Sequence, residues 1–438
     1  MKAGICEVKI TPDFPALMDG FPEPIDRFAR GVHDDLWAHC FYINNGGEEY
    51  AIVTMDLLFY TKPRVKVLRA KIEARTGIPA ENCLISCTHT HSGPVTRTNP
   101  LNRTADEREL MYPDYIEEID KRVVNALHEA KCKAFPAEIG VGKGYCGKEQ
   151  GVGGNRRDRD GIADPAVWVL GVRDLDGNPR GAIVRYSLHP TVLGQNNDLI
   201  TCDFPHYLYT EVKDKYPKMG VGFQNGTSGD QSTRHFRTGT TFEECERIGR
   251  TIGKEVIRVI ETMEYNANPT IRLTKTNVFP DRKQIPSYEV ALAAVEKARN
   301  DLNEARESGK PVPFVRTLEC TLIGAEAMLG FAKSGQEVTY AMNANHPFEI
   351  DLLAIDDARI LMISTEMFAE YSLRLYAASP FEKTYLCTCV GGLSLGYDCP
   401  QSAHDEGGYE ALVSIYTGKT GEIILDAMTD LLEKSQNA

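Results

Sequence analysis

The sequence predicts a mixed α/β fold, combining α/β and α+β features: one large domain of mixed β-sheets flanked by helices, plus a helical insertion. Short apolar runs alternate with segments of helical periodicity along the 438 residues, which is typical of proteins that combine sheets and helices. The longest apolar runs, such as 51–60, are only strand-sized and contain a charge. No repeat of fixed period runs along the chain, so solenoids and propellers are not expected.

Strands are predicted where a short apolar run ends at a turn-forming or polar residue. They cover 49–55, 83–88, 166–173, 181–188, 220–224, 269–277, 350–355, 358–365 and 384–390. Helices are predicted where apolar residues recur at intervals of three and four. They cover 64–76, 113–131, 205–215, 241–263, 287–308, 366–378 and 406–434.

The segment 287–308 has the clearest helical pattern. Its apolar positions recur at spacings of four and three, at Ala291, Val295, Ala298, Leu302 and Ala305. Ser287 can cap the start of this helix and Gly309 can lie just past its end, which are the residue types preferred there. We expect an arm or hairpin within 280–335 that is added to the main body, with one helix face packed against the core.

Composition and charge exclude several classes of protein. A hydrophobic fraction of 42% is too high for a wholly disordered chain. A net charge of −13 argues against nucleic acid as a partner, because that needs a basic surface. The first residues, MKAGICEVKITPDF, lack the apolar core of a secretory signal, and no apolar stretch is long enough to span a membrane. We therefore expect a cytoplasmic protein that binds a small-molecule substrate; a homo-oligomer is compatible with the sequence.

Twelve cysteines raise the question of disulfides or a zinc cluster. No CxxC pair occurs, and the nearest pairs are Cys83/Cys87 and Cys387/Cys389. Several cysteines lie inside apolar runs, where a free thiol behaves as a small hydrophobic group. We expect reduced thiols, as is usual in the cytoplasm.

The most specific polar motif follows the strand at 83–88. His89 and His91 stand two residues apart, and side chains at that spacing in an extended chain point to the same side. Two imidazoles side by side suit a transition metal. A hydrogen-bonded pair in the core or on the surface is an equally good interpretation of the motif alone.

Three further strand ends deliver polar side chains: His189 after 181–188, Glu366 after 358–365, and Tyr397 after 384–390. Ligands of open sheets gather beyond the carboxyl ends of strands, and two histidines with a carboxylate are a common catalytic zinc set. The sequence therefore indicates a zinc site, although spacing along the chain does not prove that these residues meet.

Two loops complete the candidate site. The turn at 225–236 is rich in Gly, Ser and Asp; it could cradle an oxyanion, carry a nucleophilic serine, or simply cap the next helix. The loop at 145–162 contains Arg156, Arg157 and Arg159. Guanidinium groups suit a carboxylate or hydroxyl-rich substrate, and a solvated charged loop is the alternative.

These motifs, taken in order, resemble those of the neutral/alkaline (non-lysosomal) ceramidase family, a group of zinc-dependent amidases. The matching segments run through most of the chain and are AGICEVKITP (3–12), RGVHDDLWAHC (30–40), VTMDLL (53–58), THTHSGP (88–94), NRR (155–157), LHPT (188–191), DFP (203–205), NGTSGDQS (225–232), STE (364–366) and GYDCPQSAHDEGGYE (396–410). The resemblance implies a catalytic domain over 1–438, with the helical insertion 280–335 inside it.

The resemblance also implies roles for individual residues. The zinc ligands that it implies are His89, His189, Glu366 and Tyr397. The other catalytic residues that it implies are His91, Arg156, Tyr409 and Ser232.

This sequence departs from the family pattern at several points. Thr365 replaces a glycine before the glutamate, and Thr233 replaces the proline of a GDxSP turn, which weakens a nucleophilic role for Ser232. Family members are usually exported and carry an additional C-terminal β-domain. We expect a shorter, bacterial-type form made of the catalytic domain alone.

The expected function is zinc-dependent hydrolysis of an amide (N-acyl) bond by metal-activated water, in a small polar or carbohydrate-like substrate. His91, Arg156 and Tyr409 are candidate donors to the oxyanion, and His91 could pass a proton to the leaving amine. The alternatives are true ceramide hydrolysis, a zinc esterase or deacylase, and a non-catalytic binding protein of the same fold.

Overall fold

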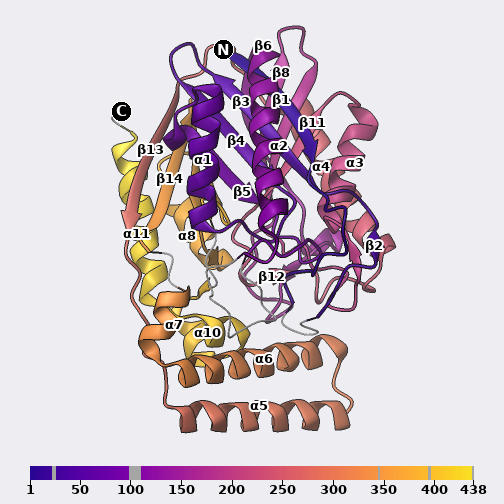
Figure 1. Cartoon of the computed structure of the whole chain (residues 1–438), viewed down its shortest axis with the longest axis vertical. Coiled ribbons are helices and arrows are strands. Elements are labelled where there is room, and N and C mark those ends of the chain that lie inside the picture. Colours follow the sequence, from indigo (N-terminus) through magenta and orange to yellow (C-terminus); the bar gives the residue numbers. More distant parts are fainter. Residues whose placement is uncertain (22–25, 98–109, 344–345, 393–395, 437–438) are drawn as a thin grey trace.

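The computed structural model describes residues 1–21, 26–97, 110–343, 346–392 and 396–436. Two mixed sheets lie face to face between helices (Figure 1). The large sheet has eight strands in the order β11-β9-β8-β6-β1-β3-β4-β5. Their bounds are β1 (Lys2–Lys9), β3 (Trp37–Asn44), β4 (Glu49–Met55), β5 (Cys83–Cys87), β6 (Phe135–Tyr145), β8 (Ala166–Asp174), β9 (Pro179–Tyr186) and β11 (Gly220–Asn225).

The small sheet has four strands in the order β13-β14-β15-β17. They span β13 (Ile271–Val278), β14 (Phe348–Ile355), β15 (Ala358–Ile363) and β17 (Lys383–Cys387). Trp168 of β8 stacks on Tyr385 of β17 with ring centroids 5.1 Å apart, so the facing sides of the two sheets share one apolar layer. The mixed α/β class predicted from the sequence is confirmed.

Helices cover the outer face of each sheet. The helices packed on the large sheet are α1 (Lys62–Thr76), α2 (Pro113–Cys132), α3 (Phe204–Lys215) and α4 (Phe242–Thr262). Those packed on the small sheet are α8 (Ala369–Ala378) and α11 (Lys419–Lys434). The molecule thus has four layers, with α1 and α2 in front of the large sheet in Figure 1.

Strand β3 shows why the layers stack in this way. Cys40 and Tyr42 belong to the apolar cluster beneath the helices, whereas Phe41 and Ile43 belong to the cluster between the sheets. Successive side chains of a strand point to opposite faces. A strand buried on both faces therefore reads as a continuous apolar run, as this one does.

The two sheets are joined at the ends of their strands. Thr388, just after β17, donates its backbone N–H to the carbonyl of Asn225, the last residue of β11, at 2.8 Å. Cys87 at the end of β5 donates to the carbonyl of Cys389 at 3.3 Å. Strand ends from both sheets are therefore held together at one edge of the molecule.

A helical hairpin extends from one end of the molecule, at the bottom of Figure 1. It consists of α5 (Tyr288–Glu307) and α6 (Val312–Ser334), followed by α7 (Gln336–Asn343). The predicted apolar stripe of α5 is buried, but against α6 rather than against the core, as the small separate cluster of Val295 and Ala298 with Ala325 shows. Ser287 caps this helix by accepting a hydrogen bond from the N–H of Val290. Helix α6 packs on α10 (Tyr409–Val413), where the Cα of Tyr409 lies 3.1 Å from the position that a Cβ on Gly324 would take.

Two predicted helices have different bounds in the structure. The helix expected at 366–378 begins at Ala369, because Glu366 and Met367 form the short strand β16 (Glu366–Met367). The helix expected at 406–434 is divided into α10 and α11 by 414–418, and its first residue is the last of α9 (Gln401–Glu406). Gly407 and Gly408 separate α9 from α10 with positive φ values of 77° and 98°, a conformation that favours glycine.

Strands β1, β3 and β6 were not among the predicted elements. Strand β6 contains three glycines, Gly140, Gly142 and Gly144, which hide the strand pattern. Helix α4 packs too closely on this strand for larger residues. A Cβ at Gly142, for example, would lie 2.6 Å from a methyl group of Val259 in α4. Close helix packing overrides residue propensity at these positions.

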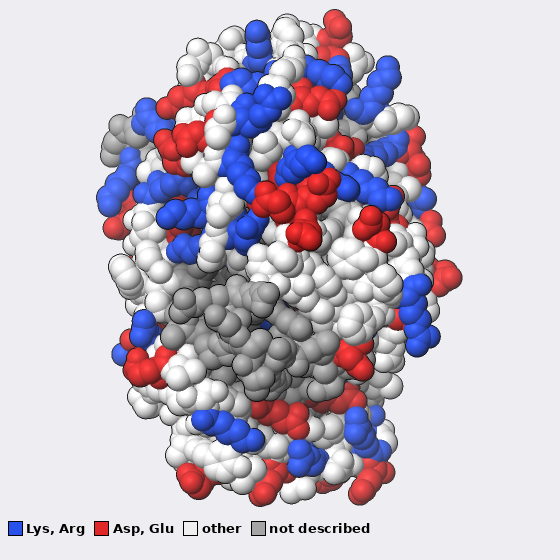
Figure 2. All heavy atoms as spheres, in the orientation of Figure 1, with Lys and Arg blue, Asp and Glu red and all other residues white. Residues whose placement is uncertain are grey.

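The surface is of mixed charge on the face that carries α1 and α2. Figure 2 shows acidic and basic side chains interspersed over this face. Within the described part of the chain, none of the helices combines the length and the apolar character needed to cross a membrane.

The packing of α3 on α4 can be tested with two glycines that both lie inside helices. A Cβ at Gly249 of α4 would lie 2.3 Å from the carbonyl oxygen of Phe204, whereas one at Gly330 of α6 meets no atom within 4 Å. We expect Gly249→Ala to lower the free energy of unfolding by about 1–3 kcal/mol, the usual cost of overpacking. Gly330→Ala, the matched control, should raise it by about 0.5–1 kcal/mol. Thermal unfolding of both variants measures this, and equal shifts would contradict the packing described.

Candidate metal centre

The residues at the strand ends meet in one buried cluster. Nε2 of His189 lies 3.1 Å from Oε2 of Glu366, and Nε2 of His89 lies 3.4 Å from the same oxygen. Glu366 in β16 pairs in parallel register with Tyr397 in β18 (Tyr397–Asp398), so these two residues stand directly opposite each other. The structure therefore brings together all four residues for which the sequence predicts zinc ligation.

Each of two imidazoles is fixed by a hydrogen bond on its far nitrogen. Nδ1 of His89 lies 2.9 Å from the carbonyl oxygen of Leu58, and Nδ1 of His189 lies 2.7 Å from that of Ser228. A carbonyl only accepts, so Nδ1 carries the proton in both rings. When each ring is neutral, its lone pair is therefore on Nε2, which faces Glu366. Hydrogen bonds of this kind orient histidine ligands in metal sites.

The backbone at His89 is in an uncommon conformation. Its φ is 68°, in the left-handed region, which non-glycine residues seldom adopt and which costs about 1–3 kcal/mol. The surrounding structure holds it there, since its N–H donates to the carbonyl of Leu57 at 2.9 Å. The turn directs the ring of His89 toward His189 instead of along the strand.

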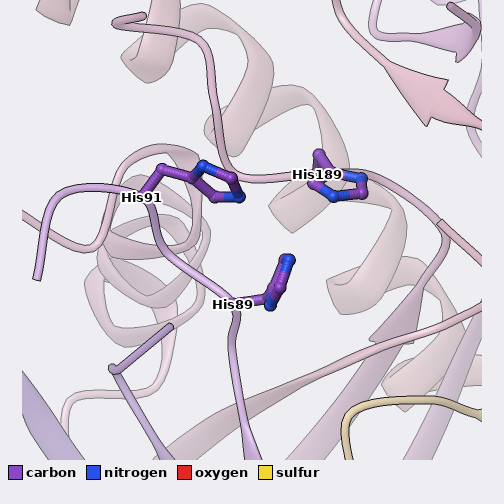
Figure 3. Close-up of side chains that lie close together, drawn as sticks. All are labelled: His89, His91 and His189. Carbon is purple, nitrogen blue, oxygen red and sulfur yellow. The ribbon is translucent and has the colours of Figure 1, made fainter. Parts of the chain in front are cut away.

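His91 lies beside the other two histidines, as predicted, but the left-handed turn at His89 brings the rings together and not the alternation of an extended strand on which that prediction rested. Its ring centroid is 5.1 Å from that of His89 and 5.6 Å from that of His189, and Figure 3 shows the three rings around a common space. Ligand atoms of the three residues all lie within 4.8 Å of one another. Within the described part of the chain, both ring nitrogens of His91 are shielded from solvent and have no hydrogen-bond partner.

Burial and neighbouring charges shift the pKa values of the histidines and of Glu366. Burial lowers the pKa of His189 to about 4. Burial, and then the neighbouring His89 and His189, hold the pKa of His91 well below its ordinary value. Burial opposes the charge of Glu366, but His89 and His189 outweigh it and hold the pKa of that carboxyl well below its usual range. Burial opposes a charge on His89, but Cys389 and Glu366 outweigh it and hold the pKa of that imidazole well above its ordinary value. The cluster thus offers two neutral imidazoles, His91 and His189, beside an ionised carboxylate paired with His89.

Two tyrosines and an arginine form the next part of the site. The rings of Tyr397 and Tyr409 have centroids 5.8 Å apart, and the guanidinium of Arg156 lies 5.4 Å from the first and 5.9 Å from the second. Burial, followed by the charge of Glu366, raises the pKa of both phenols. Both tyrosines therefore keep their protons at neutral pH and can donate hydrogen bonds.

Arg156 is held by a buried ion pair. Its Nε donates to Oε1 of Glu410 at 2.7 Å, and only 8% and 5% of the two side chains are exposed. Its N–H donates to the carbonyl of Asp230 at 2.7 Å. Its Nη2 is buried and has no partner among the described residues, so one donor is left for another group.

Ser232 lies in β12 (Gln231–Ser232), which pairs with β7 (Gly154–Asn155). Its Oγ accepts a hydrogen bond from the backbone N–H of Arg234 at 3.2 Å. The preceding Asp230 accepts from Nδ2 of Asn155 and from the N–H of Ala369, both at 2.9 Å. This turn therefore ties the arginine loop to α8, and Ser232 lies on its surface toward the cavity.

A cavity of about 340 Å³ opens over the cluster. Candidate residues in its wall are His91, Arg156, His189, Ser232, Tyr397 and Tyr409. Sequence reasoning missed other wall residues, namely Arg234, Arg237, Arg316 and Cys320. The last two lie on α6, and no pattern in the sequence places this helix at the site. A second cavity of about 200 Å³, beneath the glycine-rich loop 147–165, contains none of the candidate ligands.

The other two arginines of the 145–162 loop do not line the cavity over the cluster. Nη2 of Arg157 lies 2.8 Å from Oε2 of Glu406, and Arg159 is exposed. The solvated-loop interpretation therefore holds for Arg159, whereas Arg156 faces the cluster.

The donor set fits a transition metal. Imidazole nitrogens with a carboxylate oxygen are the ligands that zinc prefers in catalytic sites. Two rings are already oriented through Nδ1, and the nitrogens of the third have no partner among the described residues. Metal binding requires neutral imidazoles and an ionised carboxylate. His189 and Glu366 are already in these states, whereas His89 would release a proton as the ion binds.

Comparison with known proteins agrees with this arrangement. No family model matches the chain. The chain is 25% identical to the neutral ceramidase of Pseudomonas aeruginosa over 197 residues, which are 42% of this chain and only 29% of that protein. The crystal structure of that ceramidase has a TM-score of 0.73, covering 99% of this chain and 74% of the other at 18% identity. A ceramidase complexed with C2 has a TM-score of 0.72, with 100% and 75% covered at 15% identity.

These similarities confirm the resemblance to the neutral ceramidase family that the sequence motifs predict. The solved structures also confirm the fold, since nearly the whole chain superposes on each of them.

The ion pair that holds Arg156 can be tested by removing its partner. We expect Glu410→Ala to lower the free energy of unfolding by about 3–5 kcal/mol, because it leaves a buried guanidinium unpaired. The control is Glu406→Ala, whose side chain is 69% exposed and pairs with Arg157; it should cost about 0–1 kcal/mol. Thermal or urea unfolding measures the difference. Similar losses of unfolding free energy in the two variants would show that the buried ion pair of Glu410 does not stabilise the protein more than an exposed one.

Proposed function

We propose that the protein is a zinc-dependent hydrolase that cleaves an amide (N-acyl) bond in a small polar substrate. The observation that carries this proposal is the convergence of the His89 and His189 Nε2 atoms on Glu366, beside a cavity with a polar wall. The similarity to neutral ceramidases supports an amide as the bond. On this proposal residues 1–438 form one catalytic domain, with 280–335 inserted in it.

The proposed zinc ligands are His89, His189, Glu366 and Tyr397. When bound, zinc supplies a Lewis acid that polarises a carbonyl and lowers the pKa of water toward about 7. The protein keeps the ligands in place through the carbonyl groups of Leu58 and Ser228. The pairing of Tyr397 opposite Glu366 supports its assignment as the fourth ligand.

Other side chains of the cavity would act on the substrate. Hydrolysis of an amide develops negative charge on the carbonyl oxygen, which needs positioned donors. Arg156 has a buried, unpartnered Nη2, and Tyr409 keeps its phenolic proton. We assign both to this task.

His91 is the proposed proton carrier. Its ring is next to both ligand histidines, and its two nitrogens have no partner among the described residues. A neutral imidazole can accept the proton released from water and then deliver it to the leaving nitrogen.

We assign Ser232 to substrate contact rather than to nucleophilic attack. A serine nucleophile needs a base within hydrogen-bond reach of its hydroxyl. Within the described part of the chain, the hydrogen bond of this hydroxyl is to the backbone N–H of Arg234.

Ceramide hydrolysis is the second candidate, because the relatives are named ceramidases. The cavity favours a polar substrate instead, since four arginines line it together with Glu319.

Comparing a short polar N-acyl compound with a long-chain ceramide in detergent micelles decides between the two candidate functions. We expect kcat/KM to be at least about tenfold higher for the polar amide, a difference of about 1.4 kcal/mol. A preference for the ceramide would establish the second candidate, and cleavage of the matching ester alone would make the protein an esterase.

The metal centre can be tested by its metal content. We expect about one zinc per chain in the purified protein, and loss of this zinc in His189→Ala, because one imidazole ligand is removed. Amidase activity should fall at least about a hundredfold, by analogy with the cost of removing an essential stabilising group. His206→Ala, at a half-buried histidine outside the cavity, is the control and should keep both zinc and activity. Elemental analysis with circular dichroism checks the result, and a folded His189→Ala that retains stoichiometric zinc would overturn the assignment.

A further inference from the structure

Two arginines of the cavity wall carry positive charge that the described protein does not balance. Arg234 and Arg237 both line the cavity, and no carboxylate of the described residues lies within ion-pair distance of either. The other two guanidinium groups of the wall are paired: Arg156 with Glu410 at 2.7 Å, and Arg316 with Glu319 at 2.9 Å.

These two side chains are nevertheless held in place. Nη1 of Arg237 donates to the carbonyl oxygens of Thr191 and Val192 at 2.7 and 2.8 Å. Nη1 of Arg234 donates to the carbonyl oxygen of Arg156 at 3.2 Å and to Oγ1 of Thr317 at 3.1 Å. Neutral acceptors fix the position of each guanidinium without cancelling its charge.

The surroundings of Arg234 and Arg237 disfavour their charged forms. Burial lowers the pKa of Arg234 and of Arg237 by more than Cys320 raises the first and Asp203 the second. Charges withdrawn from water are ordinarily paired, and two half-buried guanidinium groups without an ion pair therefore favour a partner supplied from outside. The whole chain has a net charge of −13, so this local excess of positive charge does not reflect the composition.

We propose that the substrate carries a carboxylate, which binds Arg234 and Arg237 while the scissile amide lies over the cluster of histidines. This inference rests on the proposed function and adds the substrate class, an N-acyl compound with a free acid group such as an N-acyl amino acid. A guanidinium presents its donors in a planar fork that matches a carboxylate. His91 and His189 line the same cavity of about 340 Å³ as the two arginines, so the carboxylate and the amide of one small molecule would share this cavity.

The hairpin contributes to this subsite. Arg316 and Cys320 of α6 line the cavity, and Nη2 of Arg234 lies 3.3 Å from Sγ of Cys320. The α6 wall therefore places neutral or internally paired groups next to Arg234 and leaves its charge available to a ligand.

The test compares N-acetylglycine with N-acetylglycinamide, a neutral analogue of nearly the same size, on the zinc-loaded full chain. Equilibrium binding by calorimetry and kcat/KM are both measured. We expect the acid to bind at least about tenfold more tightly than the amide, because charge-assisted hydrogen bonds from a guanidinium to a carboxylate are stronger than those to a neutral amide. Arg234→Gln and Arg237→Gln should each reduce this preference about tenfold or more, whereas Arg237→Lys should retain part of it.

The control is Arg159→Gln, at an exposed arginine of the neighbouring loop, which should leave the preference unchanged. If the acid binds selectively but neither probe is hydrolysed, the carboxylate subsite stands and the proposed amidase activity fails for these compounds. Equal or undetectable binding of the two probes, or a preference that survives both glutamine variants with their folds intact, overturns the inference.

Discussion

The site depends on backbone hydrogen bonds that lock the ends of strands from two sheets together. The bonds from Thr388 to Asn225 and from Cys87 to Cys389 join β17 to β11 and β5. The proposed ligands come from segments as far apart in the chain as His89 and Tyr397, yet they must agree in position to within a fraction of an ångström for coordination. Rigid strands can supply that agreement because hydrogen bonds along the sheet hold their backbones in register. Helices α1–α4 and α8 with α11 then bury the outer faces of the sheets and keep the strands in register.

The strand-end residues of the site were predictable from the sequence, and its cavity was not. An apolar run followed by His, Glu or Tyr marks the end of a buried strand, and the HxH spacing places two imidazoles on one side. The structure brings His89, His189, Glu366 and Tyr397 together as this pattern implies. Arg234, Arg237 and the α6 residues were missed because their approach depends on the path of loops and on how a hairpin docks. Neither leaves a periodic signal.

The same distinction applies to the fold. Strands rich in β-branched and aliphatic residues, such as β4, β5 and β15, follow the predicted ranges closely. Strand β6 was missed because its glycines are selected by contact with α4, and β1 because its charged ends obscure a short apolar pattern. The apolar periodicity behind the predicted helix at 406–434 runs across Gly407 and Gly408, although the backbone of these two residues is not helical. These are positions where long-range packing or backbone conformation decides the structure, and a local pattern does not record it.

Helix α6 reaches the cavity from a hairpin that joins the body mainly by resting on α10, with Gly324 against Tyr409. The sheets that hold the histidines contribute nothing to this wall, and the hairpin contributes nothing to the ligand cluster. The proposed ligands and the part of the cavity wall formed by α6 therefore lie on separate segments of one chain. Substitutions of the cavity-facing side chains of α6 can reshape the surroundings of the subsite proposed at Arg234 and Arg237 without displacing the proposed ligands.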